Sequence, residues 1–421
     1  MNSKSFDTAT YADAKRLLEP LQHEVVPLAA ALVQANTVNV PPYGTETAGQ
    51  SVLRDFFSAH GIDAELYSLD FLGSCSHPYK RPDRDYAGRQ NLSVRLTGSG
   101  RGKSLLLNGH MDTVPPGRSA WTHPPWSGYT QGGRLYGLGA LDMKGGIAAQ
   151  AAAVAAVRKA GVSLAGDLLM QSVVDEEWGG GGGTLAALLR GETADAAVIS
   201  EATQLQVWRA TRGGFVVDLE VHAGDPAKYF SGEPLVSPAL PLSRLLQWIE
   251  SWVNERADHA PVQVLAIESN RLDREVPLSV PLMSTVRVYF QFLPDENVDE
   301  ILSTVQESLG EWQRTDPFYR TYPIRWKPLY NPPLLGHELP ESHEWTQCLA
   351  SAVSGVSGRP ATVAAGLYPS DAFLLHREFG IPTLLFGPSG AGAHNPDEFV
   401  EIDSILKTAE SLLSAALMWC L

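Results

Sequence analysis

A histidine and an aspartate two residues apart form the first candidate site. His110 and Asp112 follow the apolar residues 105–107 in the segment NGHMD. A metal-binding imidazole is neutral and held in one tautomer, and a nearby carboxylate can accept the proton of the ring nitrogen that does not bind the metal. A surface turn with a satisfied histidine produces the same pattern, so the pair alone leaves both interpretations open.

Acidic residues at three other places have the chemistry of metal ligands or bases. Asp142 stands at the start of a predicted Ala-rich helix over 143–159, where an aspartate is also an ordinary cap, although a cap does not explain the glycines on both sides. Glu176 and Glu177 follow an apolar run, and adjacent glutamates can divide two roles, one binding a metal and the other transferring protons. A solvated acidic turn is the alternative for this pair. Glu201 closes the run VISE.

These residues lie at the ends of predicted strands or in adjacent loops. Apolar runs predict buried strands over 104–108, 167–174 and 195–199. His394 lies in a loop that follows another apolar strand, over 382–386. Ligand sites in an α/β domain gather at the carboxyl edge of the sheet. We therefore expect the polar side chains to converge in one site.

The pattern of apolar residues changes at Gly214. Phe215, Val217, Leu219 and Val221 alternate with polar residues, which predicts a strand with one buried face. The following residues predict a helix, two strands, a helix and a strand, and this β-α-β-β-α-β order is typical of a compact α+β module.

The expected fold class is α/β with two domains. A discontinuous domain of residues 1–209 and 329–421 carries all the candidate residues named so far. An inserted α+β domain of residues 210–328 is expected to act as a lid.

The composition favours a globular protein in a reducing compartment. Lys and Arg number 32 against 47 Asp and Glu, and the net charge of −15 opposes binding to nucleic acid or to an anionic membrane. Cys75, Cys348 and Cys420 are too few and too scattered for a disulfide framework. The polar N-terminus lacks the apolar run of a signal peptide, so a cytoplasmic location is expected.

Five segments, in this order, resemble the motifs of a known family: GHMDTVPPG, LYGLGALDMKGG, VVDEEWGG, ISEA and GAHNPDEFVEID. From Leu105 to its end, the chain resembles the acetylornithine deacetylase, succinyl-diaminopimelate desuccinylase and aminoacylase family of di-zinc metallopeptidases and amidohydrolases. The resemblance implies a mixed-sheet catalytic domain of the zinc-exopeptidase type. It also implies a ferredoxin-like lid that often serves as the surface of a homodimer.

The resemblance further implies a role for each candidate residue. Two zinc ions share Asp142 as a bridging ligand, Asp112 orients His110, and Glu176 is the general base. The implied ligands are His110, Asp142 and Glu201 for one ion, and Asp142, Glu177 and His394 for the other. Co²⁺ or Mn²⁺ would accept the same donors. A metal-bound hydroxide would then attack an amide carbonyl.

The lid segment departs from the commoner family pattern. His222-Ala223-Gly224 resembles the His-Ser-Gly element of the dipeptidase branch, which makes His222 a candidate for binding substrate or stabilising an oxyanion. The arginines that relatives use to bind a substrate carboxylate are replaced by Gln291 and Phe373. Arg287 lies on the same strand face as Gln291 if the strand is regular, and is a candidate to compensate.

The resulting prediction is a metal-dependent hydrolase that cleaves the amide bond of an N-acyl amino acid or a short peptide. A dipeptidase or exopeptidase with the same metals is the alternative among enzymes. An inactive metal-binding relative that acts as a binding partner is the alternative from another class, and the presence of Glu176 beside Glu177 argues against it. The departures in the lid predict a substrate less acidic, or more apolar near its acyl group, than a succinyl amino acid.

Overall fold

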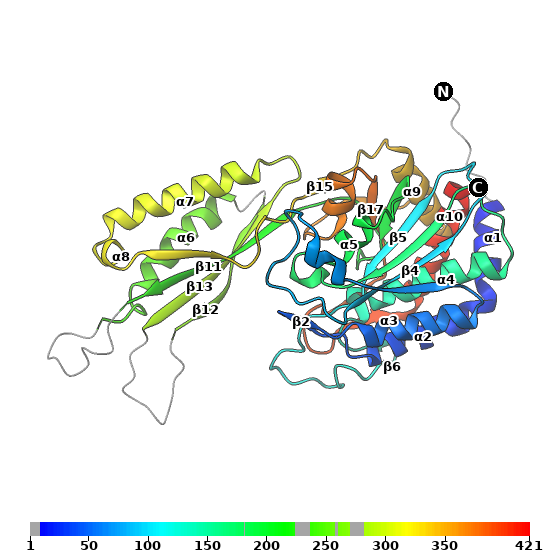
Figure 1. Ribbon diagram of the computed structural model, residues 1–421, viewed down its shortest axis with the longest axis horizontal. Helices are drawn as coiled ribbons and strands as arrows, with labels where there is room; N and C mark the ends of the chain where they lie inside the picture. Colours follow the sequence, from blue (N-terminus) through cyan, green and yellow to red (C-terminus); the bar gives the residue numbers. More distant parts are fainter. Residues whose placement is uncertain (1–8, 181, 224–235, 257–259, 270–281) are drawn as a thin grey trace. The chain divides into compact units, whose positions relative to one another are not determined.

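The computed structural model describes residues 9–180, 182–223, 236–256, 260–269 and 282–421. They fall into two compact units, which are described separately (Figure 1). The larger unit consists of Met1–Thr211, His337–Gly366 and Ser370–Leu421. The smaller unit consists of Arg212–Gly336 and Leu367–Pro369.

The smaller unit extends beyond the boundary that we expected at 329. The main-chain N–H of Leu329 donates to the carbonyl of Val216 at 2.9 Å, and Leu334 forms a β-bridge with Gly214. The proline-rich segment after 328 therefore still belongs to the smaller unit, although its composition indicates a connection between domains.

A mixed nine-stranded sheet forms the core of the larger unit. In spatial order its strands are β15 (His337–Glu338), β10 (Val207–Thr211), β17 (Thr383–Leu385), β9 (Ala196–Ile199), β5 (Leu105–His110), β8 (Leu168–Val173), β4 (Gln90–Leu96) and β3 (Ala64–Ser68), and β16 (Val363–Gly366) pairs with β10. The central strands β17, β9, β5 and β8 are parallel, whereas β4 and β3 run antiparallel to their neighbours. The predicted α/β class with a mixed sheet is confirmed.

The parallel strands end at one edge of this sheet. His110, the last residue of β5, is in register with Val173 at the end of β8, and Asn108 is in register with Ile199 at the end of β9. All three strands are buried along their whole length. Both faces of the sheet are covered there, which explains the almost continuous apolar runs in the sequence.

Helices of the larger unit cover the sheet. They are α1 (Ala9–Leu18), α2 (Gln22–Gln34), α3 (Thr47–Ala59), α4 (Gly145–Lys159), α5 (Gly183–Leu189), α9 (Glu344–Ser357) and α10 (Ile402–Cys420), with short helical turns at Glu19–Leu21, Asp70–Ser74, Ala140–Lys144, Glu176–Trp178 and Leu374–Glu378. The sequence pattern predicted α4, but we made no prediction for α1–α3 or α10.

The Ala-rich helix α4 is buried from Gly145 to Val157 and packs against α2 and α10. Its small side chains allow neighbours to approach closely. At Gly146, a Cβ atom would lie 2.0 Å from the main-chain oxygen of Ser200, so no larger residue fits without a shift. The start of α4 is thereby held against the residue that precedes Glu201.

Two small sheets complete the larger unit. One pairs β1 (Asn39–Val40) with β2 (Tyr43–Gly44). The other has the order β18 (Gly390–Ala391), β19 (Phe399–Glu401), β7 (Arg134–Tyr136) and β6 (Tyr129–Gln131). The loop between β18 and β19 contains His394, and β7 leads towards Asp142.

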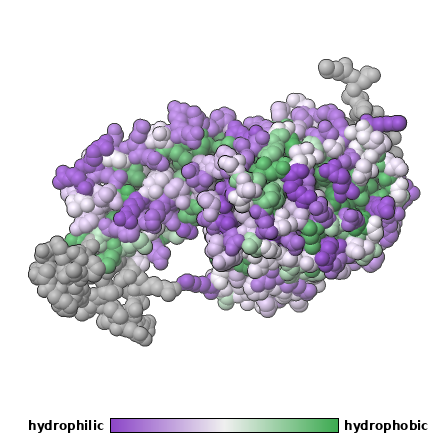
Figure 2. All heavy atoms as spheres, in the orientation of Figure 1, coloured by the Kyte–Doolittle hydropathy of each residue, from purple (hydrophilic) through white to green (hydrophobic). Residues whose placement is uncertain are grey.

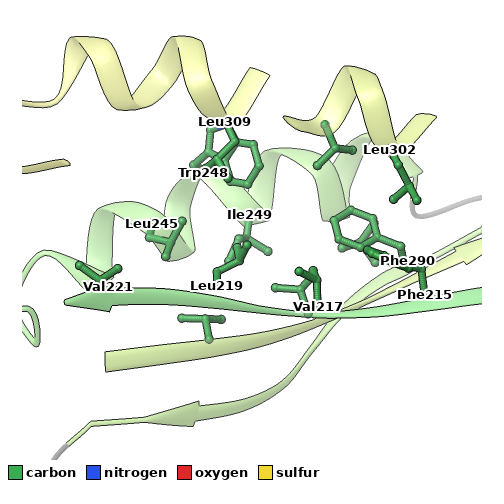
Figure 3. Packing of buried hydrophobic residues seen from close by; sticks show 14 of the residues in the cluster. Phe215, Val217, Leu219, Val221, Leu245, Trp248, Ile249, Phe290, Leu302 and Leu309 are labelled. Carbon is green, nitrogen blue, oxygen red and sulfur yellow. The ribbon is translucent and has the colours of Figure 1, made fainter. Parts of the chain in front are cut away.

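The smaller unit is an antiparallel sheet covered by helices. Its strands follow the order β12 (Val262–Glu268), β13 (Met283–Phe292), β11 (Gly213–His222) and β14 (Ile324–Pro328), and its helices are α6 (Leu242–Arg256), α7 (Val298–Thr315) and α8 (Pro317–Thr321). The alternation that predicted β11 is explained by its buried residues, which pack in one cluster with α6 and α7. Figure 3 shows Leu245 and Ile249 of α6 close to Leu219 of this strand.

Hydrophilic residues cover much of the face shown in Figure 2. Among the described residues, none of the helices combines the length and the apolar content needed to cross a bilayer. Cys75, Cys348 and Cys420 are free thiols.

Candidate metal centre

Three strands of the larger unit deliver candidate side chains to the same place. His110 ends β5, Glu176 and Glu177 lie in the helical turn after β8, and Glu201 lies just beyond β9. The Nε2 atom of His110 is 3.5 Å from Oε1 of Glu201 and 4.0 Å from Oε2 of Glu176. The carboxyl ends of parallel strands therefore bring these residues together, as expected from the sequence.

Asp142 lies between two histidines. Its Oδ1 is 3.0 Å from Nε2 of His110, and its Oδ2 is 3.3 Å from Nε2 of His394. The two carboxylate oxygens thus face different imidazoles, an arrangement suited to a bridging ligand. His394 also lies 2.9 Å from Oε2 of Glu177.

Among the described residues, potential ligand atoms gather in two overlapping groups. Atoms within each group lie within 4.8 Å of one another, and the groups are His110, Asp142 and Glu177, and His110, Glu176 and Glu201. Although Glu176 belongs to the second group, the resemblance implied that it is a base. Its carboxylate thus lies close to His110 and Glu201.

Asp112 contacts His110 through a different atom from the one that we expected. The main-chain carbonyl of Asp112 lies 3.0 Å from Nδ1 of the imidazole, whereas the carboxylate is 3.6 Å away. The carboxylate accepts hydrogen bonds from the main-chain N–H groups of Glu176 and Glu177, each at 3.2 Å. Asp112 therefore connects the histidine with the glutamate turn.

Residues that we did not predict from the sequence support the glutamate turn through hydrogen bonds and an ion pair. Asn39 is fully buried, and its Nδ2 donates to Asp112 at 2.7 Å and to Asp175 at 3.2 Å. The hydroxyl of Tyr86 donates to Asp175 at 2.9 Å, and Arg84 forms a buried ion pair with the same aspartate. None of these residues has a distinctive spacing in the sequence, because their contacts join distant segments.

The electrostatics of the site favour a bound cation. Burial raises the pKa of Glu176 and Glu201 well above their ordinary value, and burial together with the charge of Asp142 raises that of Glu177. The Oε1 atom of Glu177 is buried and has no hydrogen-bond partner among the described residues. Burying several carboxylates together is costly unless positive charge compensates, and divalent cations fit both the charge and the donor types.

The surrounding carboxylates raise the pKa of both histidines. Although burial favours its neutral form, hydrogen bonds with Asp112 and Asp142 keep the pKa of His110 well above its ordinary value. The charge of Glu177 raises the pKa of His394 to about 12. A cation bound here would require both imidazoles to be neutral.

The two remaining candidates belong to the smaller unit. His222 ends β11, its side chain is 39% exposed, and its Nε2 lies 3.1 Å from Glu220. Arg287 donates twice to Asp218, both at 2.8 Å, so a substrate carboxylate would have to compete with that pair. Both substrate roles stay predictions.

The replaced arginine positions are packed inside the protein. Phe373 is fully buried and contacts Tyr79 edge-on, with ring centroids 4.8 Å apart. Gln291 is buried and accepts a hydrogen bond from Arg212 at 2.7 Å.

Comparison with known proteins places the chain among metallopeptidase relatives. The model of "Peptidase family M20/M25/M40" matches residues 106–418. A protein of Halalkalibacterium halodurans named N-formyl-4-amino-5-aminomethyl-2-methylpyrimidine deformylase is 27% identical over 430 residues, which cover 95% of each chain. The protein of that name in Bacillus subtilis (strain 168) is 24% identical over 452 residues, which cover 98% of each chain.

Solved structures share the fold over nearly the whole chain. Human carnosine dipeptidase 1 matches with a TM-score of 0.77 and 16% identity, covering 97% of this chain and 98% of its own. The dipeptidase Dug1p of Saccharomyces cerevisiae matches with a TM-score of 0.76 and 15% identity, covering 99% of both chains. The YXEP protein of Bacillus subtilis, described as a dinuclear metal binding peptidase, matches with a TM-score of 0.59 and 12% identity, covering 96% of this chain and 100% of its own. The family match over most of the chain shows that this protein belongs to the peptidase family M20/M25/M40 and is a hydrolase of amide C–N bonds.

Proposed function

We propose that the larger unit holds two zinc ions and removes a small acyl group from an N-acylated amine. The proposed ligands are His110, Asp142, Glu177, Glu201 and His394. The observation that carries this proposal is the position of Asp142, whose two oxygens face the two histidines at 3.0 and 3.3 Å. The YXEP protein of Bacillus subtilis is described as a dinuclear metal binding peptidase of the M20 family, which supports the proposal of two metal ions.

The residues around the ligands supply positioning and proton transfer. Divalent cations bound here would act as Lewis acids towards the amide carbonyl and would lower the pKa of a water to roughly 7. Glu176 takes a proton from the attacking water and returns it to the leaving nitrogen. Burial raises the pKa of Glu176 above its ordinary value. Asp112 holds the Glu176 main chain in place.

We propose that the acyl group removed from the substrate is a formyl group or one of similar size. The two deformylase relatives align with nearly the whole chain, and their name identifies an N-formyl aminomethylpyrimidine as the substrate. Such a substrate carries no carboxylate. The buried Phe373 and the paired Arg287 are consistent with that choice, because neither offers a free guanidinium to a carboxylate.

We also propose that the smaller unit serves as a lid and as the surface of a homodimer. Its edge strand β12 exposes three apolar side chains, Val264 at 39%, Leu265 at 52% and Ile267 at 54%. An exposed apolar edge strand readily pairs with another chain. The three free cysteines support a reducing, cytoplasmic location.

Replacement of Glu176 by Gln tests the proposed base. The variant cannot accept a proton, so we expect kcat to fall by roughly 10²–10⁴-fold while both metals stay bound. The matched control is Glu401→Gln, at an exposed residue. Turnover is measured on an N-formyl aminomethylpyrimidine, N-acetyl and N-succinyl amino acids, and dipeptides. Wild-type turnover by the variant would exclude Glu176 as the base, and a preference for dipeptides would favour a dipeptidase.

A further inference from the structure

Two loops that are distant in the sequence meet beside Asp142. The β7 strand leads into the residues 137–142, and the hairpin of β18 and β19 carries His394. These segments are joined by pairing of β7 with β19, in which Tyr136 is in register with Phe399. Both loops therefore leave the same small sheet.

Glu398 lies at the junction of these loops and is 1% exposed. Its Oε2 accepts a hydrogen bond from the N–H of Gly139 at 3.0 Å. Its Oε1 accepts from the N–H of Leu141 at 2.8 Å and from that of Asp142 at 3.1 Å. The main-chain carbonyl of Glu398 also accepts from the N–H of Gly137 at 2.9 Å. The loop that carries Asp142 is therefore wrapped around one carboxylate.

The three hydrogen bonds from the loop to this carboxylate all come from main-chain N–H donors. A glutamine would place an NH₂ group against at least one main-chain N–H, so two donors would face each other. A buried donor left without an acceptor costs roughly 1–3 kcal/mol. The same carboxylate also lies near the negative charge of Asp142 and near the positive charge of the buried Lys144.

We infer that Glu398 is a positioning residue that fixes the main chain of Asp142 so that its two oxygens face His110 and His394. This inference rests on the proposed metal centre. It assigns Glu398 no contact with substrate, because its role is exerted through Asp142. Residues that orient a metal ligand typically change metal affinity or activity by roughly 10–100-fold when replaced.

The test compares Glu398→Gln with the control Glu401→Gln. Glu401 is exposed and lies in β19 on the same segment. Each full-length protein is freed of metal with a chelator and titrated with Zn²⁺ in competition with a chromophoric chelator. The visible absorption spectrum after loading with Co²⁺ reports the geometry of the ligands, and the thermal midpoint of the metal-free protein reports folding.

We expect Glu398→Gln to bind at least one cation roughly 10–100-fold more weakly and to change the Co²⁺ spectrum, with Glu401→Gln like the wild type. A folded Glu398→Gln protein with wild-type affinity and spectrum overturns the inference and leaves the proposed function intact. A wild-type protein that binds fewer than two cations overturns both. If Glu398→Gln does not fold, Glu398→Asp decides in the same way, because it keeps the charge but cannot reach all three N–H groups.

Discussion

At the residue scale, Asp112 serves both sides of the candidate centre. Its carbonyl holds His110 and its carboxylate holds the main chain of Glu176 and Glu177. Because one residue fixes a proposed ligand and the proposed base together, a small change in its side chain should disturb both.

Replacement of Asp112 by Asn tests this connection. The amide NH₂ of asparagine would face a main-chain N–H or the donor of Asn39, so the glutamate turn should shift. We expect kcat/KM to fall by roughly 10–100-fold, with weaker binding of Zn²⁺. The control is Asp403→Asn, at an aspartate whose side chain is 78% exposed. Kinetics and metal affinity equal to the wild type in Asp112→Asn would show that the carboxylate has no such role.

The sequence indicates only part of this local chemistry. His110, the glutamate pair and Glu201 could be placed together because each follows a buried parallel strand. Asp142 and His394 lie outside the strands, and their roles as metal ligands came from the resemblance to a family. Asn39 and Glu398 were missed because they act through hydrogen bonds to main-chain groups of distant segments, which leave no pattern of spacing.

At the scale of elements, a buried histidine joins three strands of the large sheet. His337 of β15 contacts the hydroxyl of Thr211 in β10 through Nδ1 at 2.9 Å, and the carbonyl of Thr383 in β17 through Nε2 at 3.2 Å. A carbonyl only accepts hydrogen bonds, so Nε2 carries the proton of a neutral ring. Burial, with His376 nearby, lowers the pKa of His337 to about 3.

This histidine predicts a loss of stability in acid. Between pH 6.5 and 3 the unfolded chain gains a proton at His337 and the folded chain does not, so each pH unit below 6.5 costs about 1.4 kcal/mol. The free energy of unfolding is measured from pH 5 to 8 for the wild type, His337→Gln and the control His23→Gln, whose side chain is 77% exposed in the wild type. The advantage of the wild type over His337→Gln should shrink as the pH falls. A constant difference would contradict the prediction.

Strong patterns in the sequence predicted the buried central strands of the large sheet and a strand of the smaller unit. Continuous apolar runs gave β5, β8 and β9, and alternation gave β11, because each pattern reflects which faces are buried. The antiparallel edge formed by β3 and β4 was not predicted. The short β3 strand is only partly buried, so its sequence carries little periodicity.

At the scale of the whole molecule, the proposed homodimer depends on the edge strand β12. A lysine in place of Leu265 would put a charge into the proposed interface, whereas Ser303→Lys adds the same charge at an exposed position of α7. We expect the wild type and Ser303→Lys to sediment as dimers and Leu265→Lys to shift towards monomers. A dimer that persists in Leu265→Lys would place the interface elsewhere, and a monomeric wild type would remove the proposal.

The most direct measurement is to locate metal in the purified protein. Elemental analysis gives the number of ions per chain, and anomalous diffraction places them relative to Asp142. The account predicts two ions, one at about 2.0–2.2 Å from each oxygen of this aspartate. Activity should disappear on chelation and return with Zn²⁺. Fewer than two ions per chain, or ions that do not contact Asp142, would contradict the account.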